Sequence, residues 1–455
     1  MADYQLIVIG SGPGGYVAAI RAAELGLGKI GVIEKNEVGG TCLNRGCIPT
    51  KTFLHSANLY GELRHSEKLG ITIEKAIVDM AKLYARKNEV VEQLQIGIKG
   101  LLKGKGITLI NGAAKIIDAG KVAVNEEVLT TEKILIATGS SPMELPIEGA
   151  DLPGVLTSDD VLGQEGQLYN KILILGGGVM GVEFASIYQG LGSEVVLIES
   201  AERLLPTQDK EISQNLQMLF KKRGIQVITG GKVQKMASRD KGLKVFYSVK
   251  EKEEFAEVDA VLITVGRSAN TQGLFADEIA PALRNGKIPV DENYQTEIPG
   301  IYAIGDVVEG SLQLAHAASA QGINAVHAMM GKEMPMDTRV IPACMYTTPE
   351  IAVVGLTADE AKAKNIPVKT GKFLMSANGK NLIEQADRGF MKVVIREDTE
   401  EIIGAQLMCP RATELIANLA GAIANKQTLK ELGRVVYPHP TFSESISEVL
   451  TAHRW

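Results

Sequence analysis

The sequence predicts an α/β protein in which one parallel-sheet unit occurs twice and is followed by a separate α+β domain. A glycine-rich turn after an apolar strand begins at Gly10 and again at Gly176, 166 positions later (176 minus 10). The next strand ends in an acid at Glu34 and at Glu199, 165 positions apart (199 minus 34). Nearly equal offsets of this kind indicate an internal duplication. From Val340 onward, apolar strands alternate with helices and the glycine-rich turn does not recur, which predicts the separate domain.

The first unit is predicted to contain a strand, a glycine-rich turn, a helix and a second strand, at residues 5–9, 10–15, 16–25 and 30–33. In the turn, Gly10, Gly12 and Gly15 allow a tight bend and a close approach of the backbone to a pyrophosphate at the helix N-terminus. Glu34 follows the second strand and is placed to accept hydrogen bonds from a ribose. A GxGxxG motif in this context predicts a dinucleotide site.

The second unit repeats this plan, with corresponding elements at residues 171–175, 176–181, 182–191 and 194–198. Its fingerprint consists of Gly176, Gly178 and Gly181. Glu199 ends the second strand, where a carboxylate favours the free 2′-hydroxyl of NAD and repels the 2′-phosphate of NADP. Arg203 lies four residues further on and is of the residue type that a 2′-phosphate recruits.

The two units differ in length. Their closing strands lead to Gly139 and Gly266, only 127 positions apart (266 minus 139), so the first copy is about forty residues longer. The extra length contains the segment GGTCLNRGCIPTK, residues 39–51, and a long amphipathic helix at 77–102. Short strands separated by polar turns are predicted at 107–131 and 231–257.

A central segment and the C-terminal domain follow the second unit. A strand at 301–306 ends in Gly305 and Asp306, and an alanine-rich helix is predicted at 314–330. The C-terminal domain is predicted to contain strands at 351–354, 390–395 and 402–408 and helices at 358–364, 413–424 and near its end.

Two cysteines, Cys42 and Cys47, lie five positions apart at the start of a predicted helix. A regular helix would place their Cα atoms about 8–9 Å apart, whereas a disulfide tolerates no more than roughly 7 Å. A bridged pair therefore requires an irregular turn, which Pro49 favours. A bridge across so short a loop reduces readily if it is strained or exposed, but two buried free thiols explain the spacing equally well. Cys344 and Cys409 lie among apolar residues and are predicted to fill the core.

One of the six histidines stands out. His439 lies between two prolines, and Glu444 follows five residues later. A carboxylate that orients an imidazole makes a general base near neutral pH. The other histidines lack acidic residues at such a spacing, and no cluster of histidine, cysteine and acid predicts a metal site.

Composition limits the remaining possibilities. At 455 residues the chain is long enough for about three domains. The net charge of −6 is spread along the chain and predicts neither nucleic acid nor a membrane surface as a partner. No run of 18 apolar residues occurs and no leader pattern precedes the first strand, so a cytoplasmic location is expected. Thiols there are kept reduced, so four cysteines do not form a structural framework.

The two fingerprints, the segment GGTCLNRGCIPTK and the terminal motif HPTFSE resemble the flavin-dependent pyridine nucleotide–disulfide oxidoreductases, most closely the members that oxidise dihydrolipoamide. The resemblance covers essentially the whole chain. It implies two Rossmann-like domains with β-meander insertions and a C-terminal α+β dimerisation domain. The implied boundaries are 1–145 for an FAD-binding domain with the redox disulfide helix, 146–270 for an NAD-binding domain, 271–339 for a central segment that completes the FAD site, and 340–455 for the interface domain.

The resemblance also assigns roles to residues. Cys42 matches the interchange thiol and Cys47 the thiol that lies against the flavin, the two forming a redox-active disulfide. Lys51 and Glu183 match the pair near the reactive edges of flavin and nicotinamide. The FAD site would further include Gly139 and Asp306, and the NAD site Gly266.

The implied reaction is the oxidation of protein-bound dihydrolipoamide, with electrons passing through the disulfide and FAD to NAD⁺. His439, held by Glu444, would act as the base toward the disulfide of the other subunit of a homodimer. The lipoyl group would arrive on the acyltransferase of a 2-oxoacid dehydrogenase complex or on the H protein of the glycine cleavage system.

Two other readings stay open from the sequence. The nearer one is an NAD(P)H-dependent reductase of a low-molecular-weight disulfide, although such enzymes generally carry arginines near the position of Glu199. The other is a flavoprotein that serves as a scaffold or electron relay without turnover. Every implied catalytic position is filled, which argues against the scaffold.

Overall fold

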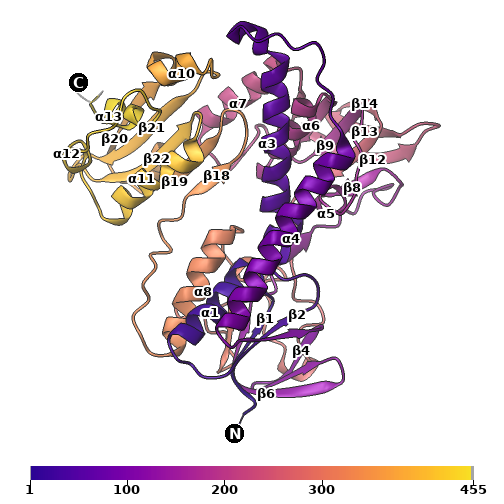
Figure 1. The fold of residues 1–455 in the computed structure, drawn as a ribbon, viewed down its shortest axis with the longest axis vertical. Helices are drawn as coiled ribbons and strands as arrows, with labels where there is room; N and C mark the ends of the chain where they lie inside the picture. Colours follow the sequence, from indigo (N-terminus) through magenta and orange to yellow (C-terminus); the bar gives the residue numbers. More distant parts are fainter. Residues whose placement is uncertain (1, 452–455) are drawn as a thin grey trace.

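A computed structural model describes residues 2–451. Figure 1 shows the first unit below, the second unit at the upper right and the C-terminal domain, in yellow, at the upper left. The long helices α3 (Cys47–Arg64) and α4 (Met80–Gly104) run from the first unit toward the second. Within the described residues, no helix is both long and apolar enough to cross a membrane.

The first sheet has a five-stranded parallel core. In spatial order its strands are β3 (Thr108–Asn111), β2 (Ile30–Glu34), β1 (Tyr4–Ile9), β6 (Glu127–Ile136) and β17 (Ile301–Ala303). The strand β5 (Lys121–Val124) pairs antiparallel with the first half of β6, and β4 (Ala114–Asp118) pairs antiparallel with β5. The inner strands are buried on both faces, which explains their almost continuously apolar sequences.

The second sheet repeats this parallel core in the same order. Its strands are β11 (Gln226–Thr229), β10 (Glu194–Glu199), β9 (Lys171–Leu175), β15 (Ala260–Ile263) and β8 (Val155–Thr157). The two sheets differ in where the fifth strand lies in the chain. In the second sheet, β8 comes before the other four strands, whereas in the first sheet β17 comes after the other four. The shared order confirms the predicted duplication.

Small antiparallel sheets surround these cores. A meander is formed by β12 (Gly231–Ser238), β13 (Leu243–Val249) and β14 (Lys252–Val258). The short strands β7 (Ser140–Pro142) and β16 (Arg267–Ala269), one after each closing strand, pair with each other and join the two units.

The central segment supplies the first unit with a helix as well as a strand. α8 (Ala315–Met329) packs on α1 (Pro13–Glu24) through small residues. A Cβ atom on Gly14 would lie 3.0 Å from the Ala318 carbonyl oxygen, and one on Gly322 would lie 2.7 Å from the Gly14 carbonyl oxygen. Larger residues at these positions would push the helices apart.

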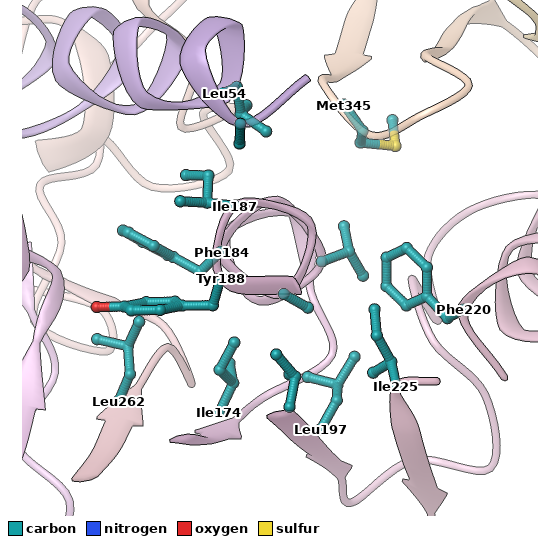
Figure 2. Close-up of a cluster of buried hydrophobic side chains, with 14 of the residues drawn as sticks. Leu54, Ile174, Phe184, Ile187, Tyr188, Leu197, Phe220, Ile225, Leu262 and Met345 are labelled. Carbon is teal, nitrogen blue, oxygen red and sulfur yellow. The ribbon is translucent and has the colours of Figure 1, made fainter. Parts of the chain in front are cut away.

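Three parts of the chain share one apolar core (Figure 2). Its centre is α6 (Val179–Leu191), whose Ile187 faces Leu54 of α3. Met345, at the end of β18 (Ala343–Met345), reaches the same cluster from the C-terminal domain. The core therefore fixes the cysteine-bearing helix against the second unit and places the C-terminal domain beside both.

A buried lysine ties α4 to the second unit. Lys87 is only 2% exposed, and its Nζ donates hydrogen bonds to the carbonyl oxygens of Leu162, at 3.2 Å, and Gly163. Burial lowers the pKa of Lys87 to about 8. The hydroxyl of Tyr84, on the same helix, donates to the Val161 carbonyl oxygen at 2.6 Å. The three acceptor carbonyl groups lie at the end of the short helix α5 (Ser158–Val161) and in the two residues after it.

The C-terminal domain is an antiparallel sheet covered by helices. Its strands, in spatial order, are β18, β19 (Ile351–Gly355), β22 (Ile402–Met408), β21 (Phe390–Arg396) and β20 (Val368–Leu374). The helices are α9 (Ala358–Ala363), α10 (Gly379–Ile383), α11 (Ala412–Ala424), α12 (Leu429–Leu432) and α13 (Glu444–Thr451). Cys409 is fully buried in this core, as predicted, whereas Cys344 is half-buried.

Most predicted elements are present, including the helices at 16–25, 77–102 and 314–330. The elements that were not predicted include α7 (Lys210–Lys222), β20 and the parallel strands β8 and β11. The buried residues of α7, Ile212, Leu216, Leu219 and Phe220, recur at helical spacing, whereas β20, with the sequence VKTGKFL, has no regular alternation. The periodicity of α7 could therefore have predicted the helix, whereas β20 carries no clear pattern.

Candidate functional site

The cysteine pair lies at a break between two helices. α2 (Gly40–Arg45) carries Cys42, the helix stops at Gly46, and α3 begins at Cys47. A Cβ atom on Gly46 would lie 2.9 Å from the Thr41 carbonyl oxygen, so the turn is closed around this glycine. The irregular turn that a bridged pair requires is therefore present. Both residues are half-buried thiols in this structure, so the disulfide itself stays a prediction.

The two thiols are not equivalent. A hydrogen bond from the Cys42 thiol, together with the nearby Lys51 ammonium, lowers the pKa of Cys47 to about 7 despite burial. The same hydrogen bond, followed by burial, raises the pKa of Cys42. The negative charge of the dithiol therefore resides on Cys47, which is also the first residue of α3, where the helix dipole favours an anion.

Lys51 lies one turn after Cys47 and pairs with a buried acid of the second unit. Its Nζ is 2.8 Å from Oε2 and 3.0 Å from Oε1 of Glu183, which lies on α6 and is 3% exposed. The main-chain N–H of Tyr346 donates to Glu183 Oε1 at 2.9 Å. The Tyr346 ring centroid is 4.5 Å from Lys51 Nζ. Three parts of the chain thus meet at one carboxylate.

His439 and Glu444 form a hydrogen-bonded pair in the C-terminal domain. His439 Nδ1 is 2.7 Å from Glu444 Oε2, and Asn378 donates to the other carboxylate oxygen at 3.3 Å. The histidine side chain is 77% exposed, so its other ring nitrogen is accessible. Among the described residues, neither His439 nor Glu444 is a hydrogen-bond or charge partner of the cysteine pair. The structure therefore brings the two predicted residues together, and the role of the pair stays a prediction.

The first glycine turn has the shape that a pyrophosphate requires. A Cβ atom on Gly10 would lie 2.3 Å from the Ala137 carbonyl oxygen, and one on Gly15 would lie 1.9 Å from the Gly10 carbonyl oxygen. A Cβ atom on Gly12, in contrast, would meet nothing closer than 3.9 Å. The first and third glycines are therefore needed for packing, while a Cβ atom on the second, at the N-terminus of α1, would make only an ordinary contact with the Gly40 Cα atom.

The second glycine turn has the same division of roles. Cβ atoms on Gly176 and Gly181 would lie 2.8 Å from the Thr264 carbonyl oxygen and 1.8 Å from the Gly176 carbonyl oxygen, respectively. Nothing lies within 4 Å of a Cβ atom on Gly178. Both turns thus leave room for a ligand phosphate at the middle glycine only.

The strand-end acid of the first unit is fixed beside its turn. Glu34 Oε2 accepts hydrogen bonds from the Ser11 N–H at 2.9 Å and the Ser11 hydroxyl at 2.7 Å. Its Oε1 accepts from the Asn36 N–H at 2.9 Å. The carboxylate is therefore held at the carboxyl end of β2, where Rossmann-like sheets bind a ribose.

The strand-end acid of the second unit has equivalent partners. Glu199 Oε2 accepts from the Gly177 N–H at 2.6 Å, and Oε1 accepts from the Ala201 N–H at 2.7 Å. Arg203, the nearby cation, donates instead to the Pro206 carbonyl oxygen at 2.6 Å. The acid, rather than the arginine, lies next to the glycine turn.

Asp306 is linked to both units by hydrogen bonds. Ser140, after the closing strand of the first unit, donates to Asp306 Oδ2 at 2.6 Å. Arg267, after the closing strand of the second unit, donates to the Ser140 hydroxyl at 2.8 Å. Gly139 and Gly266 precede these residues with φ values of +68° and +148°, which favour glycine.

Sequence reasoning did not identify Tyr346, Ser140 or Arg267 as parts of these sites. Ser140 and Arg267 directly follow the predicted site residues Gly139 and Gly266, and this adjacency could have identified them, whereas Tyr346 lies far from the cysteines and fingerprints in sequence. Only the association of the C-terminal domain and the β7–β16 pairing brings them there.

Comparison with known proteins identifies the family. The model for pyridine nucleotide-disulphide oxidoreductases matches residues 4–322, and the model for the dimerisation domain of the same family matches residues 341–450. The chain belongs to the pyridine nucleotide-disulphide oxidoreductases. Its membership confirms the predicted fold class, and the two glycine turns fit the flavin and pyridine nucleotide cofactors of the family.

Individual relatives cover nearly the whole chain. A dihydrolipoyl dehydrogenase of Bacillus subtilis is 40% identical, with 99% of this chain and 98% of that protein aligned. A dihydrolipoyl dehydrogenase of Thermus scotoductus is also 40% identical over the same shares. Among solved structures, LpdA from Mycobacterium tuberculosis superimposes with a TM-score of 0.91 at 29% identity, covering 98% of this chain and 99% of that one.

Proposed function

We propose that this oxidoreductase is a dihydrolipoyl dehydrogenase, which oxidises protein-bound dihydrolipoamide and reduces NAD⁺. The observation that carries the proposal is the Cys42–Cys47 dithiol across the break between α2 and α3, with its low-pKa thiol one turn before Lys51. Relatives of that name at 36–40% identity over nearly the full length support it. They disfavour a reductase of low-molecular-weight disulfides.

The dithiol chemistry follows from the unequal cysteines. In the oxidised protein, a thiolate of dihydrolipoamide attacks the Cys42 sulfur, and the bond to Cys47 breaks. Cys47 leaves as a thiolate, which its lowered pKa favours. The second substrate thiol then attacks the mixed disulfide at the substrate sulfur, which releases lipoamide and leaves Cys42 as a thiol. Two electrons have then moved from the substrate to the cysteine pair.

Bound FAD would supply the hydride-transfer chemistry that links the cysteine pair to NAD⁺. The chain's own contribution there is the Lys51–Glu183 pair, whose charges would orient the reactive edges of both cofactors. Gly10, Gly12, Gly15 and Glu34 would hold FAD, together with Gly139 and Asp306. Gly176, Gly178, Gly181 and Glu199 would hold NAD, with Gly266 beside it.

The base in this proposal is His439, oriented by Glu444. Because the dyad is exposed and is not a partner of the cysteines in its own chain, we assign it to the disulfide of a second subunit. The matched dimerisation domain supports a homodimer. Large exposed apolar side chains in this domain, such as Leu382, Ile383 and Val436, also favour burial against another copy.

The proposal also covers the protein that carries the lipoyl group, the cellular location and the domain boundaries. A lipoyl-bearing acyltransferase of a 2-oxoacid dehydrogenase complex, or the H protein of the glycine cleavage system, would present the substrate in the cytoplasm. The units would divide at 1–145, 146–270, 271–339 and 340–455. The β17 strand and α8 helix, which the central segment adds to the first unit, support this division.

Anaerobic titration of the purified flavoprotein tests the proposal. Dihydrolipoamide and NADH should each reduce the protein and produce a long-wavelength charge-transfer band, while NADPH should not. Reduction by NADPH alone, with dihydrolipoamide inert, would overturn the assignment in favour of a low-molecular-weight disulfide reductase.

Mixed dimers test the proposed position of the base. Neither His439→Gln nor Cys42→Ser alone should support dihydrolipoamide oxidation at more than about 1% of the normal rate. Heterodimers of the two variants restore one complete site if His439 serves the other subunit. A statistical mixture, half of it heterodimers, should then recover roughly a quarter of the wild-type activity. No recovery in verified heterodimers would place the base in its own subunit.

A further inference from the structure

Tyr346 contacts both members of the Lys51–Glu183 ion pair. Its ring centroid lies 4.5 Å from Lys51 Nζ, and its main-chain N–H donates to Glu183 Oε1 at 2.9 Å. Tyr346 directly follows β18 and belongs to the C-terminal domain. One residue of that domain thus touches a lysine of the first unit and an acid of the second.

The backbone around Tyr346 is well anchored. Its neighbours Met345 and Thr347 are 0% and 2% exposed, and Met345 lies in the core shared with α6 (Figure 2). Thr348 donates a hydrogen bond to Asn58 of α3 at 2.9 Å. The ring is therefore presented to Lys51 from a fixed main chain.

The side chain of Tyr346 is uncharged near neutral pH, so its ring presents a neutral π face to Lys51. Burial raises the pKa of Tyr346 to about 12, so the phenol is not ionised near neutrality. An ammonium over the face of such a ring is attracted by its quadrupole. This attraction limits the positions that the flexible lysine side chain can adopt.

The position of this ammonium affects the redox thiol. The charge of Lys51 lowers the pKa of Cys47, whereas the charge of Glu183 raises it. A lysine that moves toward solvent would weaken the first effect and leave the second in place. Holding Lys51 between the ring and the carboxylate therefore favours the thiolate.

We propose that Tyr346 is a positioning residue of the active centre. Its ring and main-chain N–H hold the Lys51–Glu183 pair in place, so that Cys47 is kept as a thiolate leaving group. The inference deepens the proposed function, since it rests on Cys47 being the thiol that leaves. It makes the association of the C-terminal domain a requirement for thiol reactivity in addition to dimerisation.

The test is a pH titration of the Cys47 thiolate in the reduced protein. Thiolate absorbance is followed in the ultraviolet, with each variant compared with the same variant carrying Cys47→Ser. Tyr346→Leu should shift the midpoint upward by about half a pH unit, which is roughly a threefold loss of thiolate below the midpoint. Tyr346→Phe, which keeps the ring and loses only the hydroxyl, should titrate like the wild type.

Two controls separate positioning from general damage. Lys29 Nζ lies 4.5 Å from the ring centroid of Tyr4, the same distance, at the end of β1 away from the glycine turn. Tyr4→Leu should leave the Cys47 midpoint unchanged. In a Lys51→Met background, Tyr346→Leu should cause no further shift, because the ring acts through the ammonium.

An unchanged midpoint in Tyr346→Leu overturns the proposal, as does an equal shift in the Lys51→Met background. If Tyr346→Leu does not fold, Tyr346→Met supplies a side chain of comparable length without a π face and carries the same expectations. The titration uses no substrate. Failure of dihydrolipoamide to reduce the wild-type protein would therefore overturn the proposed function without deciding the role of Tyr346.

Discussion

The ammonium of Lys51 lies 2.8 Å from the carboxylate of Glu183, although the two residues are 132 positions apart. The pair joins α3 of the first unit to α6 of the second. Because Glu183 is only 3% exposed, its charge is largely shielded from water and depends on this partner.

Removing the cation should be costly. We expect Lys51→Met to lower the free energy of unfolding by about 3 kcal/mol, since it leaves a buried carboxylate with only the Tyr346 N–H and no cation. Chemical denaturation of the reduced protein measures this. The exposed Arg86–Glu89 pair is the matched control, and Arg86→Met should cost less than about 1 kcal/mol. Equal costs for the two variants would contradict the buried-charge argument.

The reactivity and stability of the reduced protein should depend on Cys47. Its pKa, lowered to about 7, means that the thiolate forms above this pH and is lost as the pH falls through it. An unfolded chain releases this proton only near pH 8.5. Stability should therefore rise between about pH 7 and 8.5, where the unfolded state binds more protons. Comparison with Cys47→Ser in urea at several pH values measures the rise, and a parallel pH dependence in both proteins would contradict it.

The glycines of the second turn should separate folding from binding. Gly181→Ala places a Cβ atom 1.8 Å from the Gly176 carbonyl oxygen and should cost at least about 3 kcal/mol in stability. Gly178→Ala meets nothing within 4 Å at a φ of −74° and should change stability by less than about 1 kcal/mol. It should nevertheless weaken NAD binding about tenfold or more, because the methyl group occupies the approach of the pyrophosphate. Thermal melting without nucleotide and fluorescence titration with NADH give the two quantities. Wild-type NADH affinity in Gly178→Ala would contradict the site.

Glu199 should determine the choice of nicotinamide cofactor. In the proposed NAD site Glu199 would accept hydrogen bonds from the ribose, so Glu199→Ala should weaken NADH binding roughly tenfold to a hundredfold and reduce discrimination against NADPH. The equivalent acid of the first unit supplies the control. Glu34→Ala should reduce retention of FAD without altering the ratio of NADH to NADPH affinities. If both variants altered that ratio equally, the assignment of Glu34 to the FAD site and Glu199 to the NAD site would be wrong.

Lys87 should make the free energy of unfolding depend on pH in the alkaline range. Its pKa is lowered by burial from 10.5 to about 8, so between these values the unfolded state holds a proton that the folded state has lost. Wild-type stability should therefore rise over this interval relative to Lys87→Met, by on the order of 2 kcal/mol. Denaturation curves of both proteins at pH 8 and pH 10 measure the difference. A constant difference would show that Lys87 is charged in the folded state.

The sequence was most informative where function depends on local order. The fingerprints, the acids Glu34 and Glu199 and the break between Cys42 and Cys47 all follow from neighbours within one strand–turn–helix segment. His439 and Glu444 were also recognisable, since five residues separate them.

Contacts between distant segments were not predictable from pattern. Nothing in the residues near Tyr346 points to Lys51, because their contact depends on how the C-terminal domain packs on α3 and α6. The burial of Lys87 has no signal in the sequence, because its partners, the carbonyl groups of Leu162 and Gly163, lie in a distant segment. In both cases the partner lies in another unit, more than 70 residues away.

The late position of β17 also affects the order of assembly during protein synthesis. All five parallel strands of the second sheet are made between residues 155 and 263, whereas the first sheet begins at residue 4 and lacks its last strand until residues 301–303 emerge. A nascent chain can therefore complete its second nucleotide-binding sheet while the first still exposes one edge of β6. Folding on the ribosome, which commonly proceeds from the N-terminus, would here finish the later unit first and leave the first unit open until the central segment has left the exit tunnel.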